Sequence, residues 1–404
     1  MNKAVKRICL TLLCMALAIL LIMSISAAVF GPEYMGRIIS NGESKVTDYL
    51  FFPERVIAKS ARPYTYAYDI DKSLGDLQIS FEGEGGKTRT ASLLRVAADN
   101  DTTSLIVLRN DVVVFEDYLN GSTRESVNTS FSSVKSIDSL LIGLAIQDGY
   151  IKSVSQPIID FIPEWRDTAF SSITIEDLLL MRSGIHYEEG LAWFTDDAKT
   201  YYIPDLRDLV LHKTWLDKSY HGQFHYNNYH PLLLGIILER STGKTVAGYF
   251  REKIWDRIGA EYDASWSLDS KETQFEKMES GLNIRSIDYV KIGSMLLHRG
   301  TFNGQDVLDA DWIEKSTIAP AQLTRDDSDS AYLADRSVGY QYMWYSIKNS
   351  RGGHDFFAAG KYGQYLYVSP ENNVVIVRTG TNTGSVVFWP EIFRQIAEHA
   401  GSGI

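Results

Sequence analysis

Strand-like segments stand at both ends of this chain, and a long section with helical periodicity separates them. Near the start, residues 104–109 and 112–118 are rich in β-branched residues and flank the two-residue turn Asn110-Asp111, which is typical of an antiparallel hairpin. Near the end, short apolar runs predict further strands over 340–347, 355–359, 364–368 and 373–378. A terminal helix is predicted over 387–399. Strands from both ends most economically share one antiparallel sheet with helices on its faces. The predicted class is α+β.

The middle of the chain, from residue 130 to about residue 320, has the period of helices. The clearest helices are predicted over 174–182, 230–241 and 286–298. We therefore predict one domain over 76–404, with its sheet built from 76–122 and 336–404 and a helical lobe from 123–335. Residues 31–75, which are mixed and aromatic, are predicted to form a tether and an N-terminal arm that packs on this domain. A site is expected at the seam between sheet and lobe.

Residues 1–30 form a separate segment. Three basic residues precede an apolar run from Ile8 to Phe30 that is long enough to span a bilayer. We predict an uncleaved single-pass anchor in the cell membrane, with the domain on the extracytoplasmic side. The small residues Ser26-Ala27-Ala28 keep the alternative of a cleaved signal peptide and a secreted domain open.

Composition and charge exclude several classes of function. Both cysteines, Cys9 and Cys14, fall in the apolar segment, so the domain has no disulfide, no thiol nucleophile and no cysteine-ligated metal. The net charge is −11, and no basic run follows residue 30, which argues against a nucleic-acid partner.

Ser132 and Lys135 form a Ser-x-x-Lys pattern at the start of a predicted helix. A spacing of three residues places the hydroxyl and the ammonium on one helix face. A lysine shielded from water can act as a base towards the neighbouring serine, which allows covalent acyl transfer to that serine. On spacing alone, the ordinary interpretation is a serine cap on a core helix. The same pattern recurs at Ser241 and Lys244, where Gly243 indicates a helix end.

A second pattern, Tyr226-x-Asn228, precedes an apolar helix. In an extended segment the two side chains project to one side. A phenol near a lysine is suited to proton transfer, and an asparagine amide both donates and accepts hydrogen bonds. The alternative interpretation is structural: these residues would form an aromatic loop before a core helix, with no catalytic role.

Taken together, Ser132-x-x-Lys135, Tyr226-x-Asn228 and a late strand ending in Gly360 resemble the three motifs of the serine β-lactamase and penicillin-recognising enzyme superfamily. The segments 173–185, 287–305 and 360–370 lie at positions, relative to these motifs, where the family carries similar segments. Within the superfamily the chain resembles the class C-like branch, and most of all the 6-aminohexanoate-dimer (nylon oligomer) hydrolases and related carboxylesterases. The resemblance covers about 75 to 400 and implies a β-lactamase/transpeptidase-like fold.

The resemblance implies a role for each matching residue. Ser132 would be the acyl-accepting nucleophile, with Lys135 and Tyr226 as its proton-transfer partners, either of which could be the base. Asn228 would orient the substrate amide. Backbone N–H groups of Ser132 and of Lys361, the residue after Gly360, would form the oxyanion hole. No metal or organic cofactor is implied.

The third motif departs from the family pattern. Relatives that act on penicillins or D-Ala-D-Ala ends carry Lys or His, then Thr or Ser, then Gly, whereas this chain has Ala358-Ala359-Gly360. The groups that help to hold a substrate carboxylate are therefore missing. Lys361 is expected to point to the other face, because side chains alternate along a strand.

We therefore expect a serine hydrolase that cleaves small neutral amides or esters. A D,D-peptidase or β-lactamase and a non-catalytic binding module on the same fold are the alternatives. The absence of a Gly-x-Ser-x-Gly elbow gives an α/β-hydrolase no support.

Three other groups of residues lie outside the three motifs. Tyr187 and Trp193, with Phe194, are expected to line the acyl pocket, although an aromatic cluster explains them equally well. His221, His225 and His230 lie close in sequence but match no familiar zinc pattern, so no metal site is predicted. Glu116 and Asp117 are interpreted as a solvated strand edge rather than an acid/base pair.

Overall fold

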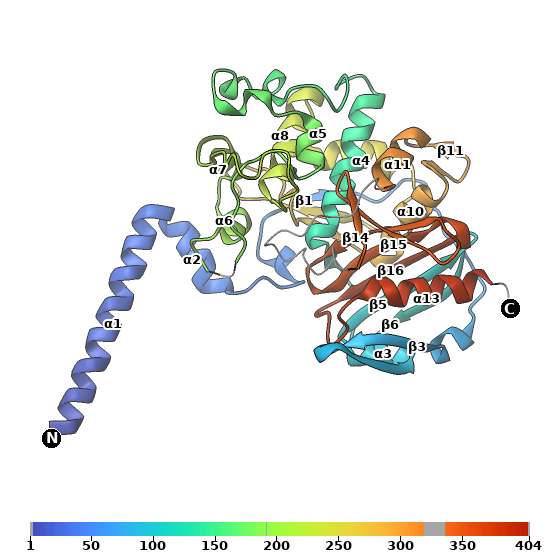
Figure 1. Ribbon diagram of the computed structural model, residues 1–404, viewed down its shortest axis with the longest axis horizontal. Coiled ribbons are helices and arrows are strands. Elements are labelled where there is room, and N and C mark those ends of the chain that lie inside the picture. Colours follow the sequence, from blue (N-terminus) through green and yellow to red (C-terminus); the bar gives the residue numbers. More distant parts are fainter. Residues whose placement is uncertain (1–2, 191, 319–335, 403–404) are drawn as a thin grey trace.

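The computed structural model describes residues 3–190, 192–318 and 336–402, so the last part of the predicted helical lobe, 319–335, lies outside the described residues. An eight-stranded sheet runs in the order β12-β13-β14-β15-β16-β5-β6-β2 (Figure 1). Its strands are β2 (Ala67–Tyr68), β5 (Thr102–Arg109), β6 (Val112–Tyr118), β12 (Gly339–Gln341), β13 (Trp344–Lys348), β14 (His354–Gly360), β15 (Gln364–Ser369) and β16 (Val374–Gly380).

All neighbours in this sheet are antiparallel except β2 and β6, which are parallel, so the sheet is mixed. Strand β16 from the end of the chain pairs with β5 from its beginning, which confirms that the two ends share one sheet. The β5–β6 hairpin is also as predicted. Asn110 and Asp111 have φ of 49° and 58°, the left-handed values that a tight two-residue hairpin turn requires.

Helices cover both faces of the sheet. On one face, α13 (Trp389–Gly401) places Phe393 against Tyr365 and Tyr367 of β15. On the other face lies α10 (Ser286–Leu297), whose Gly293 approaches Leu366 and Val375. Tyr365 and Leu366 are consecutive and so point to opposite faces. The hairpin of β3 (Gln78–Gly83) and β4 (Lys87–Ser92) lies beside α13 and α3 (Leu93–Asp99) (Figure 1).

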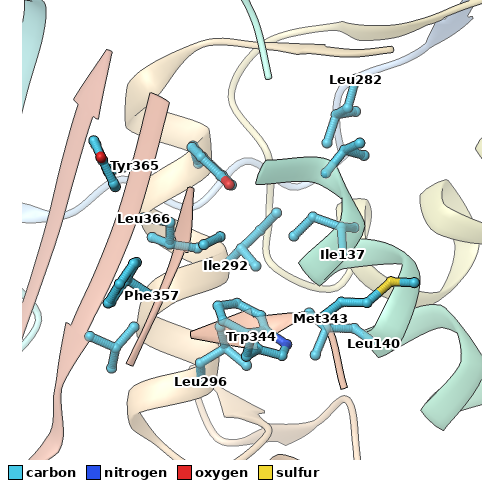
Figure 2. Close-up of a cluster of buried hydrophobic side chains, with 14 of the residues drawn as sticks. Ile137, Leu140, Leu282, Ile292, Leu296, Met343, Trp344, Phe357, Tyr365 and Leu366 are labelled. Atoms are coloured by element: carbon cyan, nitrogen blue, oxygen red, sulfur yellow. The ribbon is translucent and has the colours of Figure 1, made fainter. Parts of the chain in front are cut away.

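The largest core fills the space between the sheet, α10 and α4 (Val134–Gln147). Figure 2 shows side chains from all three elements meeting there: Ile137, Leu140, Ile292, Leu296, Met343, Trp344 and Leu366. Burial of this apolar surface fixes the position of α4 against the sheet, at about 25 cal/mol per Å². Because Ser132 directly precedes α4, the core also fixes the candidate site.

The remaining helices form the lobe above the sheet (Figure 1). They are α5 (Ile175–Leu179), α6 (Asp196–Tyr202), α7 (Leu206–His212), α8 (Tyr229–Thr242), α9 (Val246–Phe250), a π-helical turn (Arg251–Trp255) and α11 (Ala310–Thr317), with a small hairpin of β10 (Thr301–Phe302) and β11 (Gln305–Asp306). Helix α5 begins as predicted, at a Thr174 capping box with Asp177. It ends at Leu179 because Met181 has a φ of 56°. Helix α8 is followed by Gly243 in the left-handed conformation.

A second sheet of four antiparallel strands takes three of its strands from the region predicted to be the helical lobe and one from the N-terminal arm. Its order is β1 (Glu54–Ile57), β8 (Ala264–Ser267), β9 (Leu282–Ile284) and β7 (Asn128–Thr129). Strands of two to four residues are too short to show a period of two, so the sequence does not reveal them. This sheet joins the N-terminal arm to the residues just before Ser132.

The predicted strand over 340–347 is instead the two strands β12 and β13. Tyr342 and Met343 between them have φ of 43° and 65°, which turns the chain back on itself. Left-handed φ is unusual for bulky residues, so no glycine or asparagine marks this turn in the sequence.

The N-terminal arm begins with helix α2 (Pro32–Asn41), where the sequence suggested only a tether. Helix α1 (Lys3–Phe30) leads into it and projects away from the domain (Figure 1). Tyr34 and Met35 of α2 are buried in a small apolar cluster with Phe52 and Tyr202. The arm is therefore packed on the domain beside α6.

Candidate active site

Ser132 lies in a 3-10 turn (Phe131–Ser133) between β7 and α4. Ser130, just before the turn, donates its backbone N–H to Leu282 O of β9 at 2.8 Å and its hydroxyl to Ser280 O at 3.2 Å. Phe131 has a φ of 46°, a sparsely populated conformation for an aromatic residue. The small sheet and α4 thus hold Ser132 on a constrained turn that presents its side chain to a pocket.

Lys135 projects from the first turn of α4 towards Ser132, as the three-residue spacing predicts. Its Nζ donates to Ser132 Oγ at 2.8 Å and to the Glu279 carbonyl oxygen at 3.0 Å. The Lys135 side chain is buried, with 2% of its surface exposed. These two acceptors and the burial of the side chain fix the amine beside the hydroxyl oxygen.

Two buried carboxyl groups lie near Lys135. Asp138, one turn further along α4, is fully buried, and neither of its carboxyl oxygens has a hydrogen-bond partner among the described residues. Burial raises the pKa of Asp138 well above its ordinary value, and the nearby Lys135 ammonium opposes the rise. Glu279 Oε1 forms an ion pair with Lys277 at 2.9 Å, whereas its Oε2 has no partner. The surroundings of Lys135 are therefore acidic and dry.

Tyr226 lies against Lys135 through the face of its ring. The Lys135 Nζ is 5.0 Å from the ring centroid, a cation–π distance. Among the described residues, no hydrogen bond joins the Tyr226 hydroxyl to Ser132 or to Lys135. The structure therefore brings Tyr226 to the site. Ser132 and Lys135 share a hydrogen bond, whereas Tyr226 contacts Lys135 through its ring.

Gly360 ends strand β14 directly against the Ser132 turn. A Cβ atom at this position would lie 2.3 Å from Ser130 O and 3.1 Å from Ser133 N, both of which are backbone atoms. Only glycine allows the two segments to approach this closely. The backbone amides of Ser132 and Lys361 thus belong to segments in direct contact, and both residues line the same pocket.

Lys361 does not turn to the far face of the sheet, as strand alternation had suggested. The strand ends at Gly360, and Lys361 begins a 3-10 turn over Lys361–Gly363 in which Tyr362 has a φ of 65°. Alternation does not extend into such a turn. The Lys361 side chain reaches back to Glu43 and Ser44 of the N-terminal arm.

Asn228 reaches the pocket at the first turn of α8. Its Nδ2 donates to Tyr187 Oη at 2.5 Å and to Asp197 Oδ1 at 2.9 Å. Its Oδ1 is buried without a partner. Tyr187 donates to Asp197 at 2.9 Å and lies behind Asn228, outside the pocket lining. Burial is the largest cause of the raised pKa of Asp197. Tyr187 and Asp197 thus hold the amide nitrogen of Asn228 in place at the pocket wall.

Trp193 lies away from the pocket, at the N-terminal arm. Its Nε1 donates to Ser26 Oγ of α1 at 3.2 Å, and its carbonyl oxygen accepts a hydrogen bond from Tyr34 of α2. Trp193 packs beside Phe194, which is half exposed. The predicted contact of Trp193 with an acyl group is replaced by a contact between the domain and α1.

The pocket over Ser132 has a volume of about 340 Å³ and lies between the sheet edge, the lobe and the N-terminal arm. Its lining comprises Ile38, Gly42, Glu43, Ser44, Phe131, Ser132, Gly190, Asp197, Ala198, Tyr201, Tyr202, Asn228, Glu279, Ser280 and Lys361. Three carboxylates face a single lysine in this set. The walls from α2, α6 and the loop at 279–280 were not foreseen from the sequence, because no local pattern marks residues that meet only through packing.

The three histidines hydrogen-bond to other residues rather than to a shared centre. His230 Nε2 lies 2.6 Å from Ser183 Oγ, and burial lowers the pKa of His230 to about 3. His225 contacts Tyr187 O at 2.9 Å, and His221 contacts Ser183 O at 3.3 Å. Among the described residues, no cluster of three or more histidine, cysteine or acidic side chains is placed to hold a metal ion.

Glu116 is engaged in an ion pair away from the pocket. Its carboxylate pairs with Arg124, which also reaches Glu261 at 3.3 Å. Tyr118 donates to the same carboxylate at 2.7 Å. This position supports a structural rather than a catalytic role for the end of β6.

A mixed sheet between helices, with a serine beside a buried lysine at the edge of a helical lobe, defines a β-lactamase/transpeptidase-like serine hydrolase. The Beta-lactamase family matches residues 95–401, and the chain belongs to this family. It is 24% identical over 323 residues to the 6-aminohexanoate-dimer hydrolase of Paenarthrobacter ureafaciens. The aligned region covers 75% of this chain and 77% of that hydrolase.

Solved structures show the same fold. A structure from Bacillus anthracis, provisionally named a 6-aminohexanoate-dimer hydrolase, superposes with a TM-score of 0.74 at 23% identity, covering 89% of this chain and 92% of that one. A family VIII carboxylesterase superposes with a TM-score of 0.57 at 16% identity, covering 75% and 93%.

Proposed function

We propose that this protein hydrolyses small uncharged amides or esters through an acyl-enzyme on Ser132. The observation that carries the proposal is the 2.8 Å contact between Ser132 Oγ and the buried Lys135 Nζ, at the edge of a pocket that Ser132 itself lines. A hydroxyl held against a dehydrated amine has the arrangement of an activated nucleophile. The names of the hydrolase and the carboxylesterase above support an amide or ester bond as the one that is cleaved.

In the proposed reaction, Lys135 takes the proton of Ser132 as Oγ attacks the substrate carbonyl. The backbone N–H groups of Ser132 and Lys361 stabilise the resulting oxyanion. The proton passes to the leaving amine or alcohol, with Tyr226 beside Lys135 as the second proton-transfer group. The C–N or C–O bond breaks and leaves an acyl ester on Ser132. Water then attacks this ester and restores the free serine.

The charge of the pocket supports an uncharged substrate. Ala358 and Ala359 offer neither a cation nor a hydroxyl, and the pocket lining contains three acidic side chains and one lysine. An anionic group such as a penicillin carboxylate therefore lacks the charge-assisted hydrogen bonds that relatives supply. A D,D-peptidase or β-lactamase is correspondingly disfavoured.

The proposed location is the extracytoplasmic face of the membrane. Arg7–Phe30 of α1 forms a 24-residue apolar helix, which by length and composition suits either an anchor or a signal peptide. The contacts of Ser26 with Trp193, and of Ala27 and Phe30 with the cluster around Tyr34, support an anchor that stays attached. The mass of the N-terminal peptide from the membrane fraction distinguishes the two.

The test of the reaction is Ser132→Ala in the full chain. We expect hydrolysis of 4-nitrophenyl butyrate, and covalent labelling by a fluorescent phosphonate, to be lost. Ser241→Ala, in the other Ser-x-x-Lys pattern, is the matched control and keeps both. Unchanged hydrolysis by Ser132→Ala would refute the proposal, and a wild-type protein that no phosphonate labels would favour a binding module. Labelling of the wild type by a fluorescent penicillin would favour the peptidase alternative.

A further inference from the structure

The mouth of the pocket contains an ion pair between the N-terminal arm and the end of β14. Lys361 Nζ lies 3.2 Å from Glu43 Oε1 and 3.0 Å from Ser44 Oγ. Lys361 is the one lysine or arginine among the described residues that line the pocket, and Glu43 and Ser44 line it as well. Glu43 therefore pairs with the one positively charged side chain in the described pocket lining.

The arm that carries Glu43 is firmly attached on both sides of the pair. In α2, Arg37 donates to Asp269 O at 2.6 Å, and Asn41 donates to Tyr202 Oη at 2.9 Å. Beyond α2, the Ser44 carbonyl oxygen accepts from Tyr362 Oη at 2.5 Å. Glu43 is thus held opposite Lys361 by the fold of the arm.

We propose that Glu43 is a specificity-determining residue, which neutralises Lys361 and thereby makes the pocket select uncharged over anionic acyl groups. The proposal rests on the proposed function and deepens it. With Glu43 in place, an incoming carboxylate meets a lysine that is already paired, and the acidic side chains of Glu43 and Asp197 line the same pocket. Without the charge of Glu43, the same carboxylate meets a free ammonium.

The expected change in substrate discrimination is that produced by losing a partly exposed ion pair. The Lys361 side chain is 40% exposed and the Glu43 side chain 63% exposed, so solvent screens the pair. Removing one such charge is expected to change discrimination by about fivefold. Glu43→Gln retains the length and an acceptor oxygen for Lys361, so mainly the charge changes.

The experiment compares two substrates on the full chain in detergent: 4-nitrophenyl methyl succinate, which is neutral, and 4-nitrophenyl succinate, which lacks the methyl group and is anionic. The measured quantity is the ratio of kcat/KM for the anionic ester to that for the neutral one. We expect E43Q to raise this ratio about fivefold at low salt and less at 0.5 M NaCl, because salt screens exposed charges.

Two further variants and one control complete the design. In E43Q/K361M the gain should vanish, because the freed ammonium is gone. Lys361→Met alone should lower the ratio, because it leaves Glu43 unpaired, and this change of opposite sign tests the proposal even if E43Q does not fold. Glu33→Gln removes an equal charge from α2, where Glu33 pairs with Arg37 outside the pocket lining, and should leave the ratio unchanged.

An E43Q ratio equal to that of the wild type, or a gain that persists in E43Q/K361M, would overturn the inference while leaving the serine hydrolase intact. If the wild type hydrolyses neither ester and Ser132 takes no phosphonate, the proposed function fails instead.

Discussion

Replacing Gly360 by alanine tests whether the end of β14 must touch the Ser132 turn. Gly360 has φ −136° and ψ 158°, an extended conformation that any residue adopts, so alanine brings no backbone strain. The whole effect comes from the added methyl group. Its carbon would lie 2.3 Å from Ser130 O and 3.1 Å from Ser133 N.

The size of the effect follows from this overlap. Real Cβ atoms stay beyond 3.0 Å from such neighbours, so the two segments must separate by at least 0.7 Å, the difference between 3.0 and 2.3 Å. Both contacted atoms are backbone atoms of the turn that carries Ser132, so no side chain can rotate away. Overpacking of this kind costs about 1–3 kcal/mol of stability. Misplacing reacting groups by nearly 1 Å lowers activity roughly tenfold to a hundredfold.

The assay combines urea denaturation with kcat/KM for 4-nitrophenyl butyrate and the rate of phosphonate labelling at Ser132. Gly36→Ala is the control, because a Cβ at Gly36 of α2 meets no atom within 4 Å and the helix gains up to about 1 kcal/mol. A Gly360→Ala protein with wild-type stability, kcat/KM and labelling rate would refute the close approach of β14 to the Ser132 turn.

Three further predictions concern the lysine, a buried histidine and the packing of α10. Lys135→Met should lower kcat for ester hydrolysis by about 10²–10⁴-fold, because Ser132 loses its base, and a loss below tenfold would assign the base elsewhere. His230 has a folded pKa of about 3 against an ordinary value of 6.5, so the unfolded chain binds a proton that the folded chain does not. The free energy of unfolding should therefore fall as pH decreases from 6.5 to 3, by up to about 1.4 kcal/mol per pH unit, and His230→Gln should lack this contribution in urea titrations. Gly293→Ala should cost about 1–3 kcal/mol in the same titration, because its Cβ would lie 2.3 Å from Val375 Cγ1, and an unchanged midpoint would contradict this packing.

Much of the fold is predictable because its signals are local. The β5–β6 hairpin follows from two β-branched runs around Asn110-Asp111, and α8 ends at Thr242 before a left-handed Gly243, as that glycine indicates. Where local signals are weak, the prediction is wrong. The β12–β13 turn uses Tyr342 and Met343, and β7, β8 and β9 are too short for a periodic pattern.

The sequence by itself indicated the Ser132–Lys135 pair, because a separation of three residues at a helix start places two side chains on the same helix face. Only the tertiary structure decided what surrounds that pair. Glu279, Asp197 and Glu43 reach the pocket from three distant parts of the chain, and Lys361 faces Glu43 because a turn replaces the expected strand. Helical spacing acts over a few residues, whereas the walls and charges of a pocket depend on packing between segments up to 318 residues apart, which local patterns do not encode.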